Sequence, residues 1–268
     1  MARRIIVSFV FALLAACAAH AEGLAVSGLN GKVSTEAGST GAGGNSSAIG
    51  IAQGSLTAPL GHSFGLQIDG LAATAYGSFA GGGGAHLFWR DPQIGLVGPI
   101  AALAGGRGST VGLYGGEAEF YASDFTLAVQ AGGLSRNVGG GGFYRGGITF
   151  YPIPDLALSV AGGQFAGASA AFGKIEYQPD FIASRNVAFF VDAAAGDNSF
   201  YRATVGVRLY FGPQKTLIRR HREDDPVTAT VGILAASPAD LASIDLTNNA
   251  AAAAASAPQC AGILRCRL

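Results

Sequence analysis

Nine charged residues interrupt segments of the chain that are otherwise apolar, and they are the residues whose types and spacing could do chemistry. They are Asp69, Glu117, Glu119, Arg145, Lys174, Glu176, Asp192, Arg202 and Arg208. Both signs are present, so the side chains could pair with one another or present fixed charges to a passing polar solute. Which of these side chains lie close together depends on the strands that carry them.

Catalytic patterns are weaker. The four histidines are His20, His62, His86 and His221. A serine hydrolase needs a histidine base, but His86 stands beside Phe88 and Trp89 and is expected to be an interfacial residue. Glu117 and Glu119 could support acid–base catalysis, yet ion pairing with Arg145 or a neighbouring strand is favoured. We expect neither enzymatic activity nor a cofactor.

Two further patterns do not predict a ligand site. The stretch Gly105–Thr110 lacks the Gly-Lys-Ser/Thr ending of a phosphate-binding loop, so it is expected to be a plain loop. Cys260 and Cys266 are close enough in sequence to pair in an oxidising compartment, or to remain free thiols. Neither pattern has the spacing of a metal site.

The N-terminus has the features of an export signal. Arg3 and Arg4 precede an apolar core from Ile5 to Leu14, and Ala19-His20-Ala21 is a small-x-small cleavage site. Cleavage there would remove residues 1–21. Alternatively, Leu14-Ala15-Ala16-Cys17 resembles a lipobox with Cys17 as the lipidated residue. The chain is exported in either case.

The composition favours a membrane protein that crosses with strands. Hydrophobic residues make up 49% of the chain and charged residues only 13%. No run of about 18 apolar residues follows the first twenty, as a spanning helix would require. A closed β-barrel satisfies its backbone polar groups in lipid while its apolar residues alternate with polar ones.

A hairpin repeat sets the number of strands. Aromatic or apolar clusters recur roughly every 26 to 33 residues, near positions 59–64, 88–92, 120–125, 150–155, 177–181 and 209–211. That spacing suits two crossing strands of ~9–11 residues. Most clusters adjoin tight Pro/Asp turns, expected at the periplasm, and looser glycine-rich loops such as Phe79–Gly84 and Gly41–Ser47 lie between them. We predict an all-β antiparallel transmembrane barrel of about twelve strands, within a range of 10–14.

Alternation within the strands places the nine charged residues inside the barrel. In Phe200–Phe211, the predicted closing strand, apolar residues alternate with Arg202, Thr204 and Arg208. Two segments fit less well. Pro99 predicts a bulge or break in its strand, and the first strand, roughly Leu24–Thr40, is weakly patterned.

The segment Thr204–Phe211 resembles the C-terminal assembly signal of bacterial outer-membrane barrel proteins, with Gly206, Leu209 and Phe211 in its key places. The resemblance implies recognition by the outer-membrane assembly machinery and covers about Gly23–Gly212. In the usual pattern the phenylalanine is the last residue of the protein. This chain departs from that pattern because residues 213–268 follow Gly212. Within them Arg219–Asp225 is densely charged and the end is Ala-rich. We expect a mostly disordered periplasmic tail, its charged cluster a solvated collar or else a partner or cell-wall contact.

The predicted organisation is a signal peptide (1–21), a barrel (22–212) and a tail (213–268), in the outer membrane of a Gram-negative bacterium. The first functional hypothesis is a porin-like barrel for passive diffusion of small polar solutes or ions. The alternatives are a non-conducting structural or partner-binding barrel and, last, a barrel-borne hydrolase. A zero formal net charge gives no support for nucleic-acid binding. Trimeric porins usually narrow their pore with a long inward loop. The sequence shows no such loop, which favours a monomer.

Overall fold

The computed structural model describes residues 23–106, 109–136, 140–182 and 185–226. The expected signal peptide, Cys17, Cys260, Cys266 and the tail beyond Pro226 lie outside these residues. No helix in the described part of the chain is long and apolar enough to cross a membrane.

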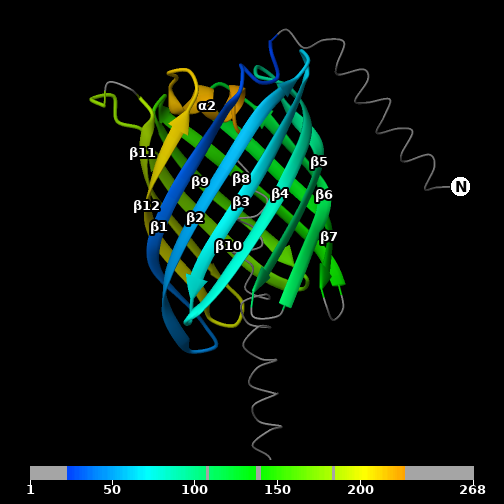
Figure 1. Cartoon of the computed structure of the whole chain (residues 1–268), viewed down its shortest axis with the longest axis vertical. Coiled ribbons are helices and arrows are strands. Elements are labelled where there is room, and N and C mark those ends of the chain that lie inside the picture. The colour runs from blue at the N-terminus through cyan, green and yellow to red at the C-terminus, as the bar shows by residue number, and fades with distance from the viewer. Residues whose placement is uncertain (1–22, 107–108, 137–139, 183–184, 227–268) are drawn as a thin grey trace, which may run out of the picture.

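Twelve antiparallel strands form one closed barrel (Figure 1). They are β1 (Asn30–Ala42), β2 (Asn45–Leu60), β3 (Phe64–Ala75), β4 (Ser78–Asp91), β5 (Gly95–Gly106), β6 (Ser109–Tyr121), β7 (Phe125–Arg136), β8 (Gly140–Ile153), β9 (Leu156–Phe165), β10 (Ala168–Tyr177), β11 (Val187–Gly196) and β12 (Phe200–Phe211). Each pairs with its neighbours in sequence, and β12 closes the barrel on β1, from Gly31 opposite Phe211 to Gly41 opposite Tyr201. The predicted strand number and closing strand are confirmed.

The wall has an apolar outer face and an inner face that carries the charges. On β6, Tyr114 and Phe120 are 62% and 55% exposed, whereas Glu117 and Glu119 point inward and are buried. On β12, Val205 is 63% exposed while Arg202 is buried. The alternation predicted from the sequence is confirmed, because successive side chains of a strand leave opposite faces.

The interior is nevertheless not uniformly polar. Five strands, β5 to β9, contribute inward apolar side chains toward their ends remote from helix α2 (Leu217–Glu223). The cluster comprises Ile100, Val111, Leu113, Leu134, Phe143 and Phe165. Phe143 and Phe165 stack with ring centroids 6.3 Å apart. These side chains pack against one another inside the wall and narrow the lumen there.

The predicted contrast between tight turns at one end and loose glycine loops at the other is wrong. Connections remote from α2 include two-residue turns with positive φ, such as Tyr76 (52°) with Gly77 (67°). Such turns match the twist of the flanking strands. The expected loop Phe79–Gly84 lies within β4, where a Cβ at Gly82 would stand 2.7 Å from the carbonyl oxygen of Leu103. Its glycines serve close packing inside the wall rather than a loop.

The break predicted at Pro99 is confirmed. Pairing between β4 and β5 lapses between the pairs His86–Ile100 and Trp89–Val97 and resumes in the same register, so the ladder has a gap without a bulge. The side chain of Pro99 is exposed on the outer face. A register shift occurs elsewhere, between β8 and β9, at Phe150 and Ile153. The first strand begins at Asn30 rather than Leu24, since residues 24–29 enter the barrel mouth.

Candidate functional site: the lumen and its plugged mouth

Two segments occupy one end of the barrel, and we call residues 24–29 and 213–226 together the plug. Helix α2 lies across the end at which β12 finishes (Figure 1). Ala25 and Val26 are buried against Phe88, Leu96 and Tyr121. The two segments are joined to each other, since the amide of Ser27 donates to the carbonyl oxygen of Glu223 at 3.2 Å.

Two arginines of α2 bind separate connections at the mouth. Arg220 is buried and donates from Nε to the Gln178 side chain (3.1 Å) and from Nη2 to the carbonyl oxygen of Arg185 (2.7 Å). Arg222 donates from Nη2 to the carbonyl oxygens of Ala122 (2.5 Å) and Phe125 (3.1 Å). The β10–β11 and β6–β7 connections are thereby tied to one helix.

A second set of bonds joins the two parts of the plug and ties them to β2 and β4. Lys215 Nζ lies 2.6 Å from the Asp224 carboxylate, which also accepts the Ser27 hydroxyl at 2.5 Å. Arg90 donates to the carbonyl oxygens of Ala25 and Asp224 at 3.2 and 3.1 Å. The Asp225 carboxylate accepts from Thr57 at 2.9 Å. Each partner is a donor or acceptor that burial would otherwise leave unpaired.

His221 faces the lumen from the inner side of α2. Its Nδ1 is 2.9 Å from the Tyr151 hydroxyl and its Nε2 is 3.5 Å from that of Tyr210. Burial lowers the pKa of His221 from 6.5 to about 3, although the nearby Glu176 carboxylate opposes this shift. The docked histidine is therefore neutral near pH 7.

The prediction of a solvated collar for Arg219–Asp225 is wrong for most of the cluster. Arg220, His221, Asp224 and Asp225 are buried. Only the ion pair between Arg219 and Glu223 resembles a solvated helix face, with the Arg219 side chain 60% exposed. Each buried charge has fixed partners: Gln178 and the Arg185 carbonyl oxygen for Arg220, Lys215 for Asp224, and Thr57 and Lys32 for Asp225.

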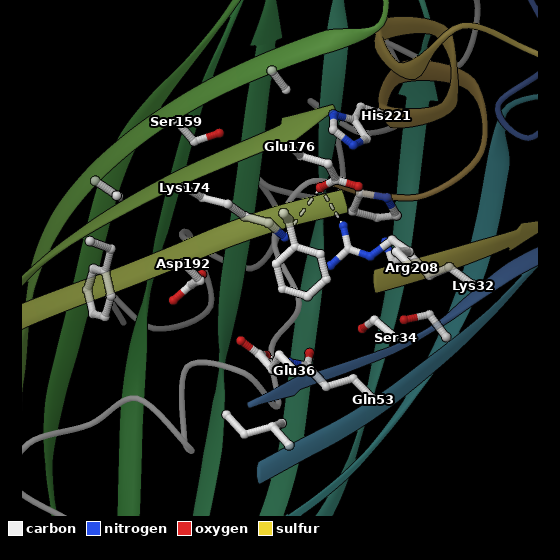
Figure 2. Close-up of a pocket in the computed structure, with 18 of the residues that line it drawn as sticks. Lys32, Ser34, Glu36, Gln53, Ser159, Lys174, Glu176, Asp192, Arg208 and His221 are labelled. Atoms are coloured by element: carbon white, nitrogen blue, oxygen red, sulfur yellow. Dashed lines mark hydrogen bonds and ion pairs between the residues drawn. The ribbon is translucent and has the colours of Figure 1, made fainter. Parts of the chain in front are cut away.

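A polar cavity of about 150 Å³ lies beneath α2, inside the wall formed by β8–β12, β1 and β2. Figure 2 shows Lys32, Glu36, Lys174, Glu176, Asp192 and Arg208 converging on it, with His221 above them. Six of the nine predicted residues line it: Arg145, Lys174, Glu176, Asp192, Arg202 and Arg208. Whether they line a conducting pore stays a prediction.

The carboxylates of this cavity are matched with donors. Glu176 lies 2.6 Å from Arg208 and 3.3 Å from Lys174, and it accepts the Tyr210 hydroxyl at 2.6 Å. Asp192 lies 2.6 Å from Arg202. Such short charge-assisted contacts hold the inner side chains in place.

The remaining three predicted residues, Asp69, Glu117 and Glu119, are buried on β3 and β6 and do not line the cavity. His86 lies between Asp69 (Nε2 to Oδ2, 3.0 Å) and Glu117 (Nδ1 to Oε1, 2.6 Å). Glu119 accepts the Tyr121 hydroxyl at 2.9 Å. The interfacial position expected for His86 is wrong, because its inward side chain is fully buried. Of the partners expected for Glu117, Arg145 is not found. Glu117 instead binds His86 and, on the neighbouring strand β7, Gln130.

Sequence reasoning missed Lys32, Glu36, Lys215 and His221 as interior residues. Lys32, Ser34, Glu36 and Thr40 share one parity of β1 and all point inward, so the period-two signal was present in a strand whose start was misplaced. The burial of Lys215 and His221 depends on residues that are distant in sequence, so the sequence around each of them does not predict it.

The proposed assembly-signal residues divide between the two faces of β12. Leu209 and Phe211 are 42% and 53% exposed on the outer face. Gly206 faces inward, where a Cβ would stand 2.4 Å from the Phe190 ring and 2.6 Å from the Thr35 carbonyl oxygen. The glycine is therefore required by packing, whatever its role in recognition.

No protein-family model matches the chain, and no curated protein matches it. Two solved structures of the KdgM porin resemble it, with TM-scores of 0.54 and 0.53 at 14% sequence identity; each covers 68% of this chain and 99% of the other. The COG4313 outer membrane channel from Pseudomonas putida F1 has a TM-score of 0.49 at 11% identity, covering 71% and 97%. At 14% identity the likeness to the KdgM porin structures is one of fold alone, that of a closed outer-membrane β-barrel.

Proposed function

We propose that the chain is a porin-like outer-membrane barrel that allows passive diffusion of small polar solutes or ions. The observation that carries the proposal is the polar cavity inside the closed wall, bounded by ionised side chains whose positions are fixed by one another. Charged side chains on the inner wall of a barrel keep the lumen hydrated and determine which polar solutes or ions pass through it. The solute-accessible surface would be this lining.

The membrane setting follows from the outer face. Side chains such as Ile68, Val160 and Val205 are 56–63% exposed and apolar, as contact with hydrocarbon requires. We propose that the barrel is a monomer whose partners are the lipid bilayer and the outer-membrane assembly machinery. We also propose that α2 and the tail lie in the periplasm.

A hydrolase remains the weakest candidate. Both ring nitrogens of His86 are engaged by carboxylates at 2.6 and 3.0 Å, so neither is available to take a proton from a serine. His62 lies exposed in the β2–β3 turn.

The plug favours a second candidate, a barrel that does not conduct. Contacts from α2 reach several sides of the mouth, and an apolar cluster narrows the lumen elsewhere. In this case the plug or tail would bind a partner instead. The two candidates differ in whether removing the plug opens a path.

Liposome swelling tests solute passage. Proteoliposomes containing the full mature chain are diluted into isotonic solutions of neutral sugars of increasing size. We expect swelling that is fastest for the smallest sugar and slows with size, because the cavity is narrow. Rates equal to those of protein-free liposomes for every sugar would count against the proposal.

A further inference from the structure

The charges on the cavity lining are unbalanced. Five cationic side chains line it, namely Lys32, Arg145, Lys174, Arg202 and Arg208, against three carboxylates, those of Glu36, Glu176 and Asp192. The excess of two positive charges is reduced by Asp225 of the plug, 3.7 Å from Lys32. A net positive lining remains.

Each carboxylate of the lining already has a partner among the surrounding side chains. Glu176 has two cationic partners, Lys174 and Arg208, and Asp192 has Arg202. Glu36 accepts hydrogen bonds from Gln53 at 2.9 Å and from the Thr204 hydroxyl. Two of the three carboxylates are therefore paired with cations of the lining, and the third is hydrogen-bonded by neutral donors.

Arg145 differs from the other cations. Among the described residues no carboxylate forms an ion pair with it, and its guanidinium lies 5.3 Å from the centre of the Phe172 ring. A ring contact leaves the edge donors of the guanidinium available. Those donors match a carboxylate or phosphate in a bidentate arrangement.

The acidic residues of the other half of the barrel do not offset this excess at the cavity. Asp69 and Glu117 hold His86 between them and are only 5% and 3% exposed. Neither lines the cavity. The accessible part of the lumen is therefore more positive than the interior as a whole.

We infer that the lumen selects small anionic solutes, those bearing a carboxylate or phosphate group, and that Arg145 determines this preference. The inference rests on the proposed function, since selectivity requires passage. Arg145 would receive the anionic group, while Lys174 and Arg208, fixed over the Phe190 ring at 4.6 and 5.0 Å, supply the surrounding positive field.

Reversal potentials of the full mature chain in planar bilayers test the inference, measured across a KCl gradient at low ionic strength where screening is weak. We expect chloride to be several-fold more permeant than potassium. Arg145→Gln should reduce that ratio several-fold, whereas Arg145→Lys should preserve it. Arg219→Gln, which removes an exposed positive charge outside the lumen, serves as the matched control and should leave it unchanged.

Inorganic phosphate provides the second readout. It should block chloride current through the native barrel at lower concentration than through Arg145→Gln. A conducting barrel that prefers potassium, or an unaltered ratio in Arg145→Gln, overturns the inference and leaves the proposed function standing. A folded barrel that carries no current even when the chain ends at Gly212 removes the proposed function, and the inference with it.

Discussion

At the scale of single residues, the interior of the barrel depends on side chains that bind in groups. His86 is the clearest case, because it separates two buried carboxylates, Asp69 and Glu117, that would otherwise repel one another. Removing one member of a buried charged group leaves the others without compensation.

His86→Ala should therefore destabilise the barrel by about 3 kcal/mol or more, the range seen when one partner of a buried ion pair is lost. Urea unfolding of the refolded protein in detergent micelles measures this. His62→Ala, in an exposed turn, is the matched substitution and should shift the midpoint little. Equal midpoints for the two variants would contradict the structural role of His86.

His221 makes plug docking depend on pH. Its pKa is about 3 when buried and near 6.5 when exposed, so the undocked histidine takes up a proton before the docked one. Docking should be strongest above pH 6.5 and weaken as the pH falls toward 3. The charged and titratable groups around it are Tyr151, Tyr210, Glu176, Lys32, Lys174 and Arg208.

Hydrogen exchange of residues 213–226, corrected for the intrinsic effect of pH, measures this docking. Exchange should rise between pH 6.5 and pH 4 in the native chain, and His221→Phe should lose most of that rise. A variant with the same pH profile as the native chain would show that another group, such as Glu176, controls docking.

At the scale of elements, the strands were predictable and their connections were not. The alternation in Phe200–Phe211 fixed both ends of β12 because a half-buried strand has a period of two. The glycines of Phe79–Gly84 were misplaced because glycine permits both turns and close strand packing. Helix α2 has seven residues, and its burial depends on partners at Ala122, Gln178 and Arg185 that only the closed fold brings together.

The two kinds of residue in β12 should separate assembly from stability. Phe211→Ala changes an exposed outer position, so it should lower the amount of folded barrel in cells while purified protein still refolds in detergent. Gly206→Ala places a methyl group against Phe190 and Thr35, so it should impair both. Heat-modifiability on gels reports the folded fraction. Normal assembly of Phe211→Ala in cells would contradict the role of Phe211 in the assembly signal.

At the scale of the whole molecule, the barrel combines a closed wall, a polar cavity and a plugged mouth. The sequence predicted the wall and the inward direction of the nine charged residues. It did not predict which charges would meet, since Glu176 and Arg208 come from β10 and β12, separated by β11. Nor did it predict the plug, whose bonds join positions up to 197 residues apart.

The central claim is that a polar path runs through the barrel and is obstructed at the α2 end by residues 213–226. Single-channel recording compares residues 22–268 with residues 22–212, after both are shown to fold by heat-modifiability. We predict small or infrequent conductance steps for the full chain and larger, sustained steps for the shortened one. Silence from both folded proteins would contradict the claim and favour a structural barrel.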